Sequence, residues 1–343
     1  MLKQECNSES IVAVGLDVHQ HVVQVCVMDQ NGQVLSNKRV ANDLADIIDV
    51  IYRYARRANL ALECSTGTAA LADALIQRTG WEVHLCHPGF VRRMRQNPDK
   101  TDLSDAHLLA DLVRVGYLPR VWLAPPAIRD LRTAVRYRQQ LVDRLRNTKL
   151  RIRALLREYR VQDAPKRLWT KCGLAWLRDL DRLPPLTSEV MQDHLADFAN
   201  NVAALARATA RLREAAGRDE VITRLLTLPG IGLVTASVLR AEIGHFGRFR
   251  NAKQLARFCG LSPRNASSGE RQADAGLIRG CSGLLRATLI EASHRLTRYE
   301  PRWKEYKRQL KERGKAGSVI AAAVANRWMR RLFHDLRALE LAA

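Results

Sequence analysis

Runs of apolar residues in the first part of the chain have the length and spacing of three successive strands. Residues 11–19 (IVAVGLDVH) and 22–29 (VVQVCVMD) are two such runs, and residues 33–40 follow the dipeptide Asn31-Gly32. Asn-Gly favours a two-residue hairpin turn, because both of its residues adopt the positive φ that this turn requires. The pattern therefore predicts a sheet that begins with a strand and a hairpin.

Helical and strand periodicities then alternate. Together with the three strands, they give the element order of the RNase H/RuvC-type fold, a mixed sheet covered by helices. The expected elements are a helix capped by Asn42 and running to Ala55, a strand at 60–64, a helix at 67–79, a strand at 81–86 and, after a loop through Pro88 and Pro98, a helix beginning with KTDLSDA (100–106).

Two acidic residues lie on expected strands beside small side chains. Asp17 alternates with Ala13 and Gly15 on one face of the first strand, and Glu63 ends its strand on the side of Ala61. Small neighbours leave space beside a carboxylate, which a binding site needs and a packed core does not. The two positions therefore indicate a site.

Two further acids, Asp102 and Asp105, share a face of the KTDLSDA helix with leucines. Ionised groups on such a face carry a desolvation penalty unless something pairs with them. An N-cap is the alternative: Thr101 or Asp102 would begin the helix, and Asp105 would lie in its positively polarised first turn. In the RNase H/RuvC-type fold these segments converge, and the resulting oxygen-rich cluster suits Mg²⁺ or Mn²⁺, with two ions per site. Its members would be Asp17, Glu63, Asp102 and Asp105. Four unrelated surface acids are the alternative, and the nearby histidines, His19 among them, are expected to be solvated or packed.

Charge is distributed unevenly along the 343 residues, whose net charge is +21. Residues 10–118 hold 11 lysines and arginines against 12 acids, whereas residues 127–160 and 298–331 each hold 11 against three. An acidic site in a neutral segment, followed by strongly basic segments, indicates a catalytic module with nucleic-acid-binding segments behind it. The alternative for either basic run is a helix face that is exposed to solvent and binds nothing.

The rest of the chain has mostly helical patterns. Residues 127–160 and 187–218 are long, arginine-rich helical segments that could form an arm. Residues 225–244 predict a helix-hairpin-helix around Pro229-Gly230-Ile231-Gly232, whose glycines would let backbone N–H groups approach a phosphate. A plain tight helical turn is the alternative there.

A polar segment at 265–275 carries Ser267-Ser268-Gly269 between Arg264 and Arg271. A serine beside arginines could be a nucleophile whose phosphate ester the guanidiniums neutralise. Most serines in such segments are turn or cap residues, which is the alternative.

Composition points to an intracellular protein. The seven cysteines show no C-x-x-C pair, no apolar run approaches the ~20 residues that cross a bilayer, and the first ten residues are polar. We expect reduced, mostly packed thiols and a cytoplasmic, nucleoid-associated prokaryotic protein that contacts no membrane.

Several motifs in order resemble the DEDD transposases of insertion sequences, the RuvC-like, RNA-guided (bridge-RNA) recombinases of the insertion-sequence one-ten class. These motifs are GLDVH, LECSTG, KTDLSDA, LPGIG, FCGLSPRNASSGE and LLRATL. The resemblance spans residues 10–330. It implies a RuvC-like catalytic domain at 1–118, a coiled-coil arm at 119–220 and a mostly helical C-terminal transposase domain at 221–343.

The resemblance also assigns roles. It implies that the four acids hold the metal and that Ser268 attacks DNA, with Ser267 as the rival nucleophile. The implied partners are donor and target DNA, a structured noncoding guide RNA and further copies of the chain, as a dimer or tetramer. The basic residues expected to contact nucleic acid are Arg264, Arg271, Lys304, Lys307 and Arg308.

Three functions follow. The first is a transposase that cuts and rejoins DNA through a serine–DNA intermediate. The second is a metal-dependent nuclease of the Holliday-junction resolvase type, which would use water and need no serine. The third is a non-catalytic nucleic-acid-binding protein, for which four clustered acids would have no purpose.

Overall fold

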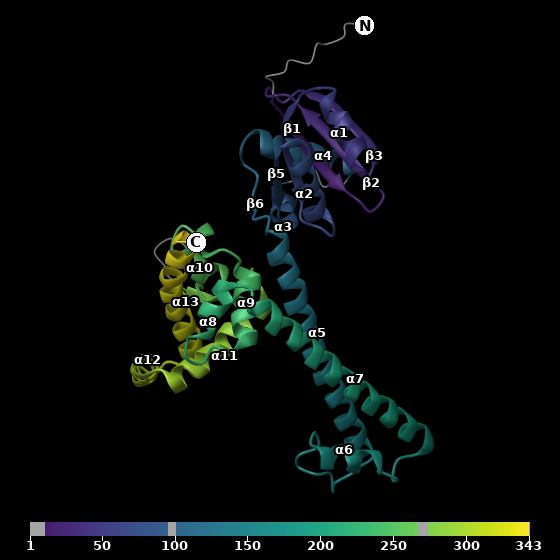
Figure 1. Cartoon of the computed structure of the whole chain (residues 1–343), viewed down its shortest axis with the longest axis vertical. Helices are drawn as coiled ribbons and strands as arrows, with labels where there is room; N and C mark the ends of the chain where they lie inside the picture. Colours follow the sequence, from purple (N-terminus) through teal and green to yellow (C-terminus); the bar gives the residue numbers. More distant parts are fainter. Residues whose placement is uncertain (1–10, 95–100, 267–273, 343) are drawn as a thin grey trace. The chain divides into compact units, whose positions relative to one another are not determined.

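A computed structural model describes residues 11–94, 101–266 and 274–342. The chain forms two compact units that divide after Leu123 (Figure 1). This boundary lies close to the end of the first expected domain, and the further division into an arm and a C-terminal domain stays a prediction. Within the described residues, no helix is both long and apolar enough to cross a membrane.

The first unit is built on a six-stranded mixed sheet of order β3-β2-β1-β4-β5-β6. Strands β1, β2 and β3 pair antiparallel, β1, β4 and β5 pair parallel, and β6 closes the edge antiparallel to β5. The strands are β1 (Ile11–Val18), β2 (Val22–Met28), β3 (Val34–Ala41), β4 (Arg57–Glu63), β5 (Glu82–Cys86) and β6 (Arg120–Val121). The predicted mixed sheet and its opening hairpin are therefore present, and the short β6 is an addition.

The two faces of strand β1 pack against different helices. Val12, Val14 and Leu16 join the core formed with helices α1 (Leu44–Tyr52) and α2 (Thr68–Thr79). Ala13, on the other face, joins a second core with helices α3 (Pro88–Met94) and α4 (Asp102–Arg114). The alternation read from the sequence thus separates the sheet's two faces, and Asp17 lies on the α4 face.

Gly15 admits helix α4 to very close contact with the sheet. A Cβ added at Gly15 would lie 1.9 Å from the Ala106 carbonyl oxygen and 2.5 Å from the Ala110 nitrogen. The expectation that small residues leave open space beside Asp17 is therefore wrong at this position. The space is filled by the backbone of the helix that carries Asp102 and Asp105.

Two local predictions in this unit are also wrong. The predicted loop after β5 contains the short helix α3, which Pro88 begins; proline suits a first helical position because its missing N–H has no partner there in any case. Asp43, not Asn42, caps α1 by accepting from the Ala45 and Asp46 nitrogens. The Asn42 amide instead donates to the carbonyl of His19 at 2.8 Å, which ties β3 to the end of β1.

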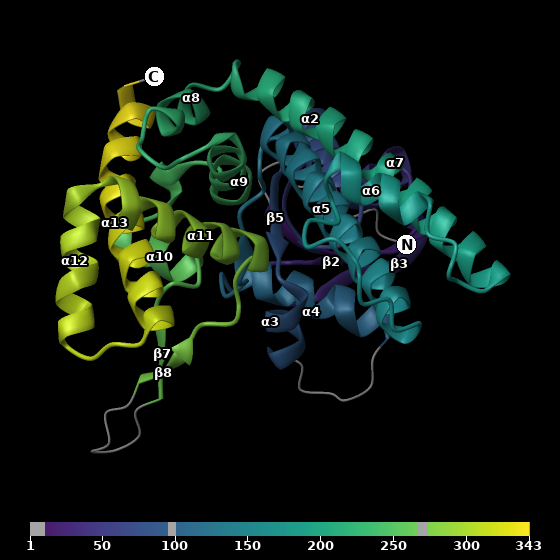
Figure 2. The same cartoon turned by 90° about the horizontal axis from the view of Figure 1, so that it is seen from below.

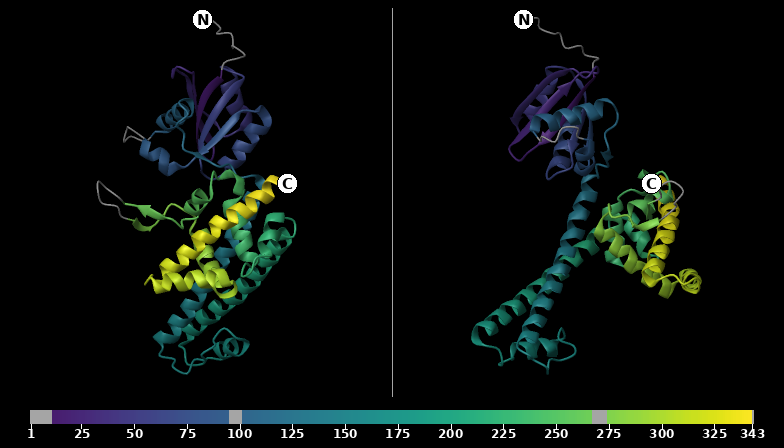
Figure 3. Two further views of the ribbon diagram at one scale, coloured as in Figure 1. Left: turned by 90° about the vertical axis from the view of Figure 1, so that its left-hand side faces the viewer. Right: turned by 180° about the vertical axis from the view of Figure 1, so that it is seen from behind.

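Two long helices begin the second unit, close to where the sequence predicts them. Helices α5 (Pro126–Glu158) and α7 (Pro185–Ala216) pack along each other (Figure 3). The short helix α6 (Lys171–Arg178) shares a core with the C-terminal end of α5 and the N-terminal part of α7. At the other end, Arg136 of α5 makes two hydrogen bonds to the buried Glu242 carboxylate, at 2.9 and 3.1 Å. Some arginines of the basic 127–160 run therefore serve packing inside the unit.

The C-terminal part packs helices around one core. Its elements are α8 (Glu220–Leu226), α9 (Leu233–Ile243), the 3-10 turn η1 (Phe246–Arg248), α10 (Ala252–Phe258), the strands β7 (Pro263–Asn265) and β8 (Asp274–Leu277), α11 (Gly283–Tyr299), α12 (Pro301–Glu312) and α13 (Gly317–Ala342). A turn with Gly230 at φ +77° joins α8 to α9. The helix, turn and helix expected from the LPGIG motif are therefore present.

Candidate catalytic site

Helix α4 begins with a reciprocal cap that fixes its first turn. The Ser104 nitrogen donates to Thr101 Oγ1, and the Thr101 nitrogen donates to Ser104 Oγ, both at 3.1 Å. This places Asp102 and Asp105 in the first turn, where the helix dipole favours negative charge. The capping interpretation is thus correct for Thr101, and it leaves both aspartates available for a site.

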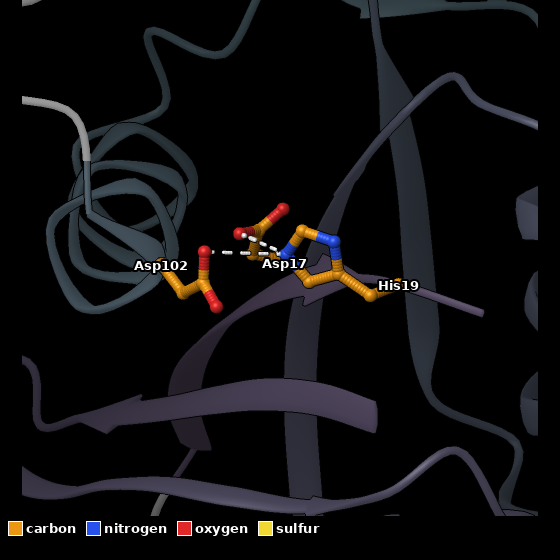
Figure 4. A group of neighbouring side chains, drawn as sticks. All are labelled: Asp17, His19 and Asp102. Atoms are coloured by element: carbon orange, nitrogen blue, oxygen red, sulfur yellow. Dashed lines mark hydrogen bonds and ion pairs between the residues drawn. The ribbon is translucent and has the colours of Figure 1, made fainter. Parts of the chain in front are cut away.

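Asp17, His19 and Asp102 form a group whose ligand atoms all lie within 4.8 Å of one another. His19 Nε2 lies 3.2 Å from an Asp17 carboxylate oxygen and 3.3 Å from one of Asp102. Figure 4 shows the two carboxylates, from β1 and from the start of α4, directed at the same nitrogen of the imidazole. Strand β1, the turn that follows it and the first turn of α4 therefore bring an oxygen–nitrogen donor set to one point.

Burial and like charge both act on Asp17. Burial raises the pKa of Asp17 above its ordinary value, and the Asp105 and Asp102 carboxylates raise it further, while His19 opposes them. Asp105 itself is only 6% exposed. The carboxylates of Asp102 and Asp105 are thus near enough to act on that of Asp17, and a bound divalent cation would relieve this repulsion. The oxygen-rich set fits Mg²⁺ or Mn²⁺.

Glu63 lies on the neighbouring strand, on the same face as Asp17. Leu16 pairs with Leu62 in the parallel β1–β4 register, so Glu63 follows directly beside Asp17. Burial raises the pKa of the Cys86 thiol to about 12, and the negative charge of Glu63 adds to this effect. The Glu63 carboxylate therefore also lies near Cys86, with which it pairs in the β4–β5 register. It is adjacent to the three-residue group without being part of it.

A chain of amides ties the sheet to the first turn of α4. Gln24, which pairs with Asp17 across β1 and β2, is 4% exposed, and its Nε2 donates to Asn37 Oδ1 at 2.7 Å. The Asn37 amide then donates to the carbonyl of Leu103 at 3.1 Å. These bonds position Asp102 and Asp105 relative to β1.

Sequence reasoning missed both His19 and Gln24. His19 is two residues after Asp17, and this spacing places two side chains on the same side of an extended chain. Gln24 is a lone amide in the apolar run VVQVCVM. Both signals were available in the sequence, but neither shows that the partner would be a carboxylate or helix α4.

The serine nucleophile stays a prediction. Ser267, Ser268 and Arg271 lie outside the described residues. Arg264 is exposed on β7, which pairs antiparallel with β8 through Asn265 and Asp274.

The three basic residues expected to contact nucleic acid on α12 are all exposed. Arg308 donates to Glu305 at 2.7 and 2.8 Å and also pairs with Glu312. These two carboxylates raise the pKa of Arg308 above its ordinary value. The charge of Arg308 is thus already compensated within the helix, whereas Lys304 and Lys307 belong to no ion pair among the described residues.

Comparison with known proteins gives concordant matches at both ends of the chain. Residues 14–161 match a family model of DEDD type described as "Transposase", and residues 222–308 match one described as "Transposase IS116/IS110/IS902 family". Among curated relatives, the "Transposase for insertion sequence element IS1111A" of Coxiella burnetii is 25% identical, over 87% of this chain and 81% of the relative. The "Probable family 20 transposase" of Pseudomonas aeruginosa is 26% identical, over 92% and 93%. The "Transposase for insertion sequence element IS1328" of Yersinia enterocolitica is 24% identical, over 94% and 95%.

Proposed function

Because the chain belongs to the IS110/IS116 family of insertion-sequence transposases, we propose that it cuts and rejoins DNA with a metal site in its first unit and a serine in its second. The observation that carries this proposal is the convergence of Asp17, His19 and Asp102, with Asp105 and Glu63 beside them. A hairpin-led mixed sheet with acids on β1, at the end of β4 and on α4 supports a RuvC-like assignment of this unit.

The residues that would hold the metal are Asp17, Asp102, Asp105 and Glu63, with His19 as a nitrogen donor. Two divalent ions bound there would activate a nucleophilic oxygen and stabilise the departing oxygen in phosphodiester chemistry. The chain's own contribution is placement: the cap at Thr101 and the Gln24–Asn37–Leu103 bonds fix where the α4 carboxylates lie.

Asp102→Asn tests the metal site. This variant should lose Mg²⁺-dependent strand cleavage and bind Mn²⁺ more weakly in calorimetry, while still binding nucleic acid. Asp111→Asn is the matched control, because Asp111 lies on the same helix but pairs with Arg114. Unchanged cleavage and Mn²⁺ binding in Asp102→Asn would refute the site.

Ser268 is the proposed nucleophile. Its oxygen would form a new bond to phosphorus as the bridging phosphorus–oxygen bond of the strand breaks, with the hydroxyl proton released and the departing DNA oxygen protonated. The phosphoserine link conserves the bond energy needed for rejoining. Denaturing electrophoresis with labelled DNA should then show a covalent adduct that Ser268→Ala lacks and Ser267→Ala retains.

The turn before α9 supports contact with the DNA backbone. Gly232 precedes α9 as its N-cap, with no side chain capping the first nitrogens, and the turn lines an open cavity of about 1010 Å³ whose charged residues are Arg213, Arg295, Asp143 and Glu291. Free N–H groups at a helix start and nearby guanidiniums suit a phosphate. These features support the helix-hairpin-helix function expected from the LPGIG motif.

Guidance by a structured noncoding RNA is the last part of the proposal, supported by the basic segments and by the family. Protein produced together with the DNA that flanks its reading frame should copurify with one RNA, and nuclease removal of that RNA should abolish site-specific cleavage. A junction-resolving nuclease is the second candidate, favoured by an acidic site that contains no serine. Cleavage by Ser268→Ala at the parent rate, with no adduct in the parent, would establish it.

A further inference from the structure

A groove lies between helices α12 and α13, and four arginines line it. The two helices run side by side (Figure 2) and border an open cavity of about 690 Å³. This volume falls within the ~300–1,000 Å³ typical of ligand sites. Polar and aromatic residues on its walls include Arg302, Tyr306, Arg327, Arg330, Arg331 and His334.

The positive charge of this groove is not compensated. Among the described residues, no ion pair involves Arg302, Arg327, Arg330 or Arg331. The acidic residue that lines the groove is Glu305, and it is held by Arg308 from outside the groove. All four arginines are exposed.

Spacing on α13 directs these side chains to one side. Arg327, Arg330, Arg331 and His334 follow one another at i, i+3, i+4 and i+7, whereas Trp328, Met329 and Leu332 are buried in the core. The basic stripe is about 10 Å long at 1.5 Å per residue. A strand stacked as in a duplex rises ~3.4 Å per nucleotide, so about three of its phosphates would lie along this stripe.

Aromatic rings support two of the guanidiniums. The Arg327 guanidinium lies 4.2 Å from the centroid of Tyr306, and that of Arg302 lies 5.3 Å from the centroid of Trp303. Trp303 is 3% exposed, which fixes α12 against the core. A stacked guanidinium keeps its N–H edges free in a preset orientation, the geometry that grips phosphate oxygens in pairs.

We propose that the α12–α13 groove binds the sugar–phosphate backbone of an unpaired nucleic-acid strand, with Arg327, Arg330 and Arg331 as the principal phosphate contacts. A positively charged groove that tracks the sugar–phosphate backbone is one of the means by which proteins bind unpaired strands. The two rings support guanidiniums here, so the proposed contacts are to phosphate. This inference rests on the proposed function only in taking nucleic acid as the partner. It moves the main contacts from Lys304 and Lys307, which were expected from the sequence, to the arginines that line the α12–α13 groove.

The test compares two variants that remove equal charge. The groove variant carries Arg327→Gln, Arg330→Gln and Arg331→Gln, and the rival variant carries Lys304→Gln, Lys307→Gln and Lys311→Gln. Affinity is measured against salt without divalent metal, on a single-stranded RNA, a single-stranded DNA of the same sequence and the corresponding DNA duplex. Because nucleic-acid binding is measured without metal, a groove that does not bind a strand would leave the Asp102→Asn cleavage test valid. A failed cleavage test would likewise leave the binding measurement valid.

The groove variant should lose about 2 units of the logarithmic salt slope on single strands, at ~0.7 per phosphate contact. The parent's affinity should therefore fall about 20-fold more steeply than the variant's between 50 and 200 mM salt. If the salt slope falls equally on single-stranded RNA and DNA, the groove binds the backbone that both share. If it falls on only one of them, that nucleic acid is the ligand of the groove. The rival variant should keep the parent slope.

Replacement of the same three arginines by lysine is the folding control. It keeps the charge, so the slope should persist, while affinity should fall because lysine lacks the planar fork. A groove variant that folds as the parent does and keeps the parent slope would overturn the proposal. A larger loss in the rival variant, or an equal loss on the duplex, would also overturn it.

Discussion

Gly15→Ala is predicted to displace helix α4 and so to damage the acidic site without changing any of its residues. The added Cβ would lie 1.9 Å from the Ala106 carbonyl oxygen, and ordinary contact begins near 3.4 Å, so the helix would have to withdraw by about 1.5 Å. The clash is between a Cβ fixed to the backbone of β1 and backbone atoms of α4, so no change of side-chain rotamer can relieve it. Overpacking of this kind costs about 1–3 kcal/mol.

Two measurements separate stability from site geometry. Thermal denaturation should show a midpoint lower by about 4–12 °C, given roughly 4 °C per kcal/mol for a unit of this size. At a temperature where the variant is folded, Mn²⁺ binding should weaken and cleavage should fall by about 100-fold, since a shift of ~1 Å can cost that much.

Gly317→Ala is the control, because a Cβ added there meets nothing within 4 Å. It should leave stability unchanged or raise it slightly. A Gly15→Ala protein with the parent's midpoint, Mn²⁺ affinity and cleavage rate would show that α4 is not seated on β1 as described.

Three further predictions concern other parts of the chain. Arg136→Ala should destabilise the second unit by about 2 kcal/mol in thermal denaturation, because it leaves the buried Glu242 carboxylate without this partner; Glu242→Gln should cost less, and equal costs would contradict this reasoning. Iodoacetamide followed by mass spectrometry should label the exposed Cys172 in the folded protein before the buried Cys86 and Cys259, since burial raises the pKa of both buried thiols. The hydrogen bond from Arg308 lowers the pKa of Glu305 from 4.5 to about 2, so this pair should stabilise α12 above pH 4.5 and lose its contribution as pH falls toward 2. Carbon-detected NMR titration should find that pKa returned toward 4.5 in Arg308→Ala, and a titration unchanged by the substitution would exclude the ion pair.

Sequence periodicity was sufficient where one rule governs local structure. The alternation in IVAVGLDVH correctly separates the core face of β1 from the face of Asp17, because side chains in a strand point to opposite sides in turn. Asn31-Gly32 correctly predicts the hairpin between β2 and β3 but not its two-residue turn. The Asp29 nitrogen donates to the Gln33 carbonyl across three residues, and Gly32, at φ +91°, has positive φ whereas Asn31 does not. These local patterns alone do not bring Asp17 and Asp102 together. That expectation also needed the hypothesis of an RNase H/RuvC-type fold.

Other features depend on contacts that no local pattern contains. A small residue such as Gly15 is compatible with an open site or with a close helix, and the approach of α4 decides between them. Basic residues pose the same difficulty. Arg308 and Arg330 belong to the same charge-rich run, yet acids one turn away on α12 compensate the first, while the second faces a groove.

The position of α4 also determines when the site forms during folding. This helix packs on β1, β2, β3 and β4, and Asp102 follows Asp17 by 85 residues. Contacts between residues so far apart in the chain form slowly, because a long loop must close before they stabilise anything. Strands β1 to β5 can pair first, from contacts closer in sequence, and α4 then docks against them. A nascent chain that has emerged only to the end of β5, at Cys86, therefore holds Asp17 and Glu63 without the other two acids, and the acidic site is complete only once the last helix of the unit has docked.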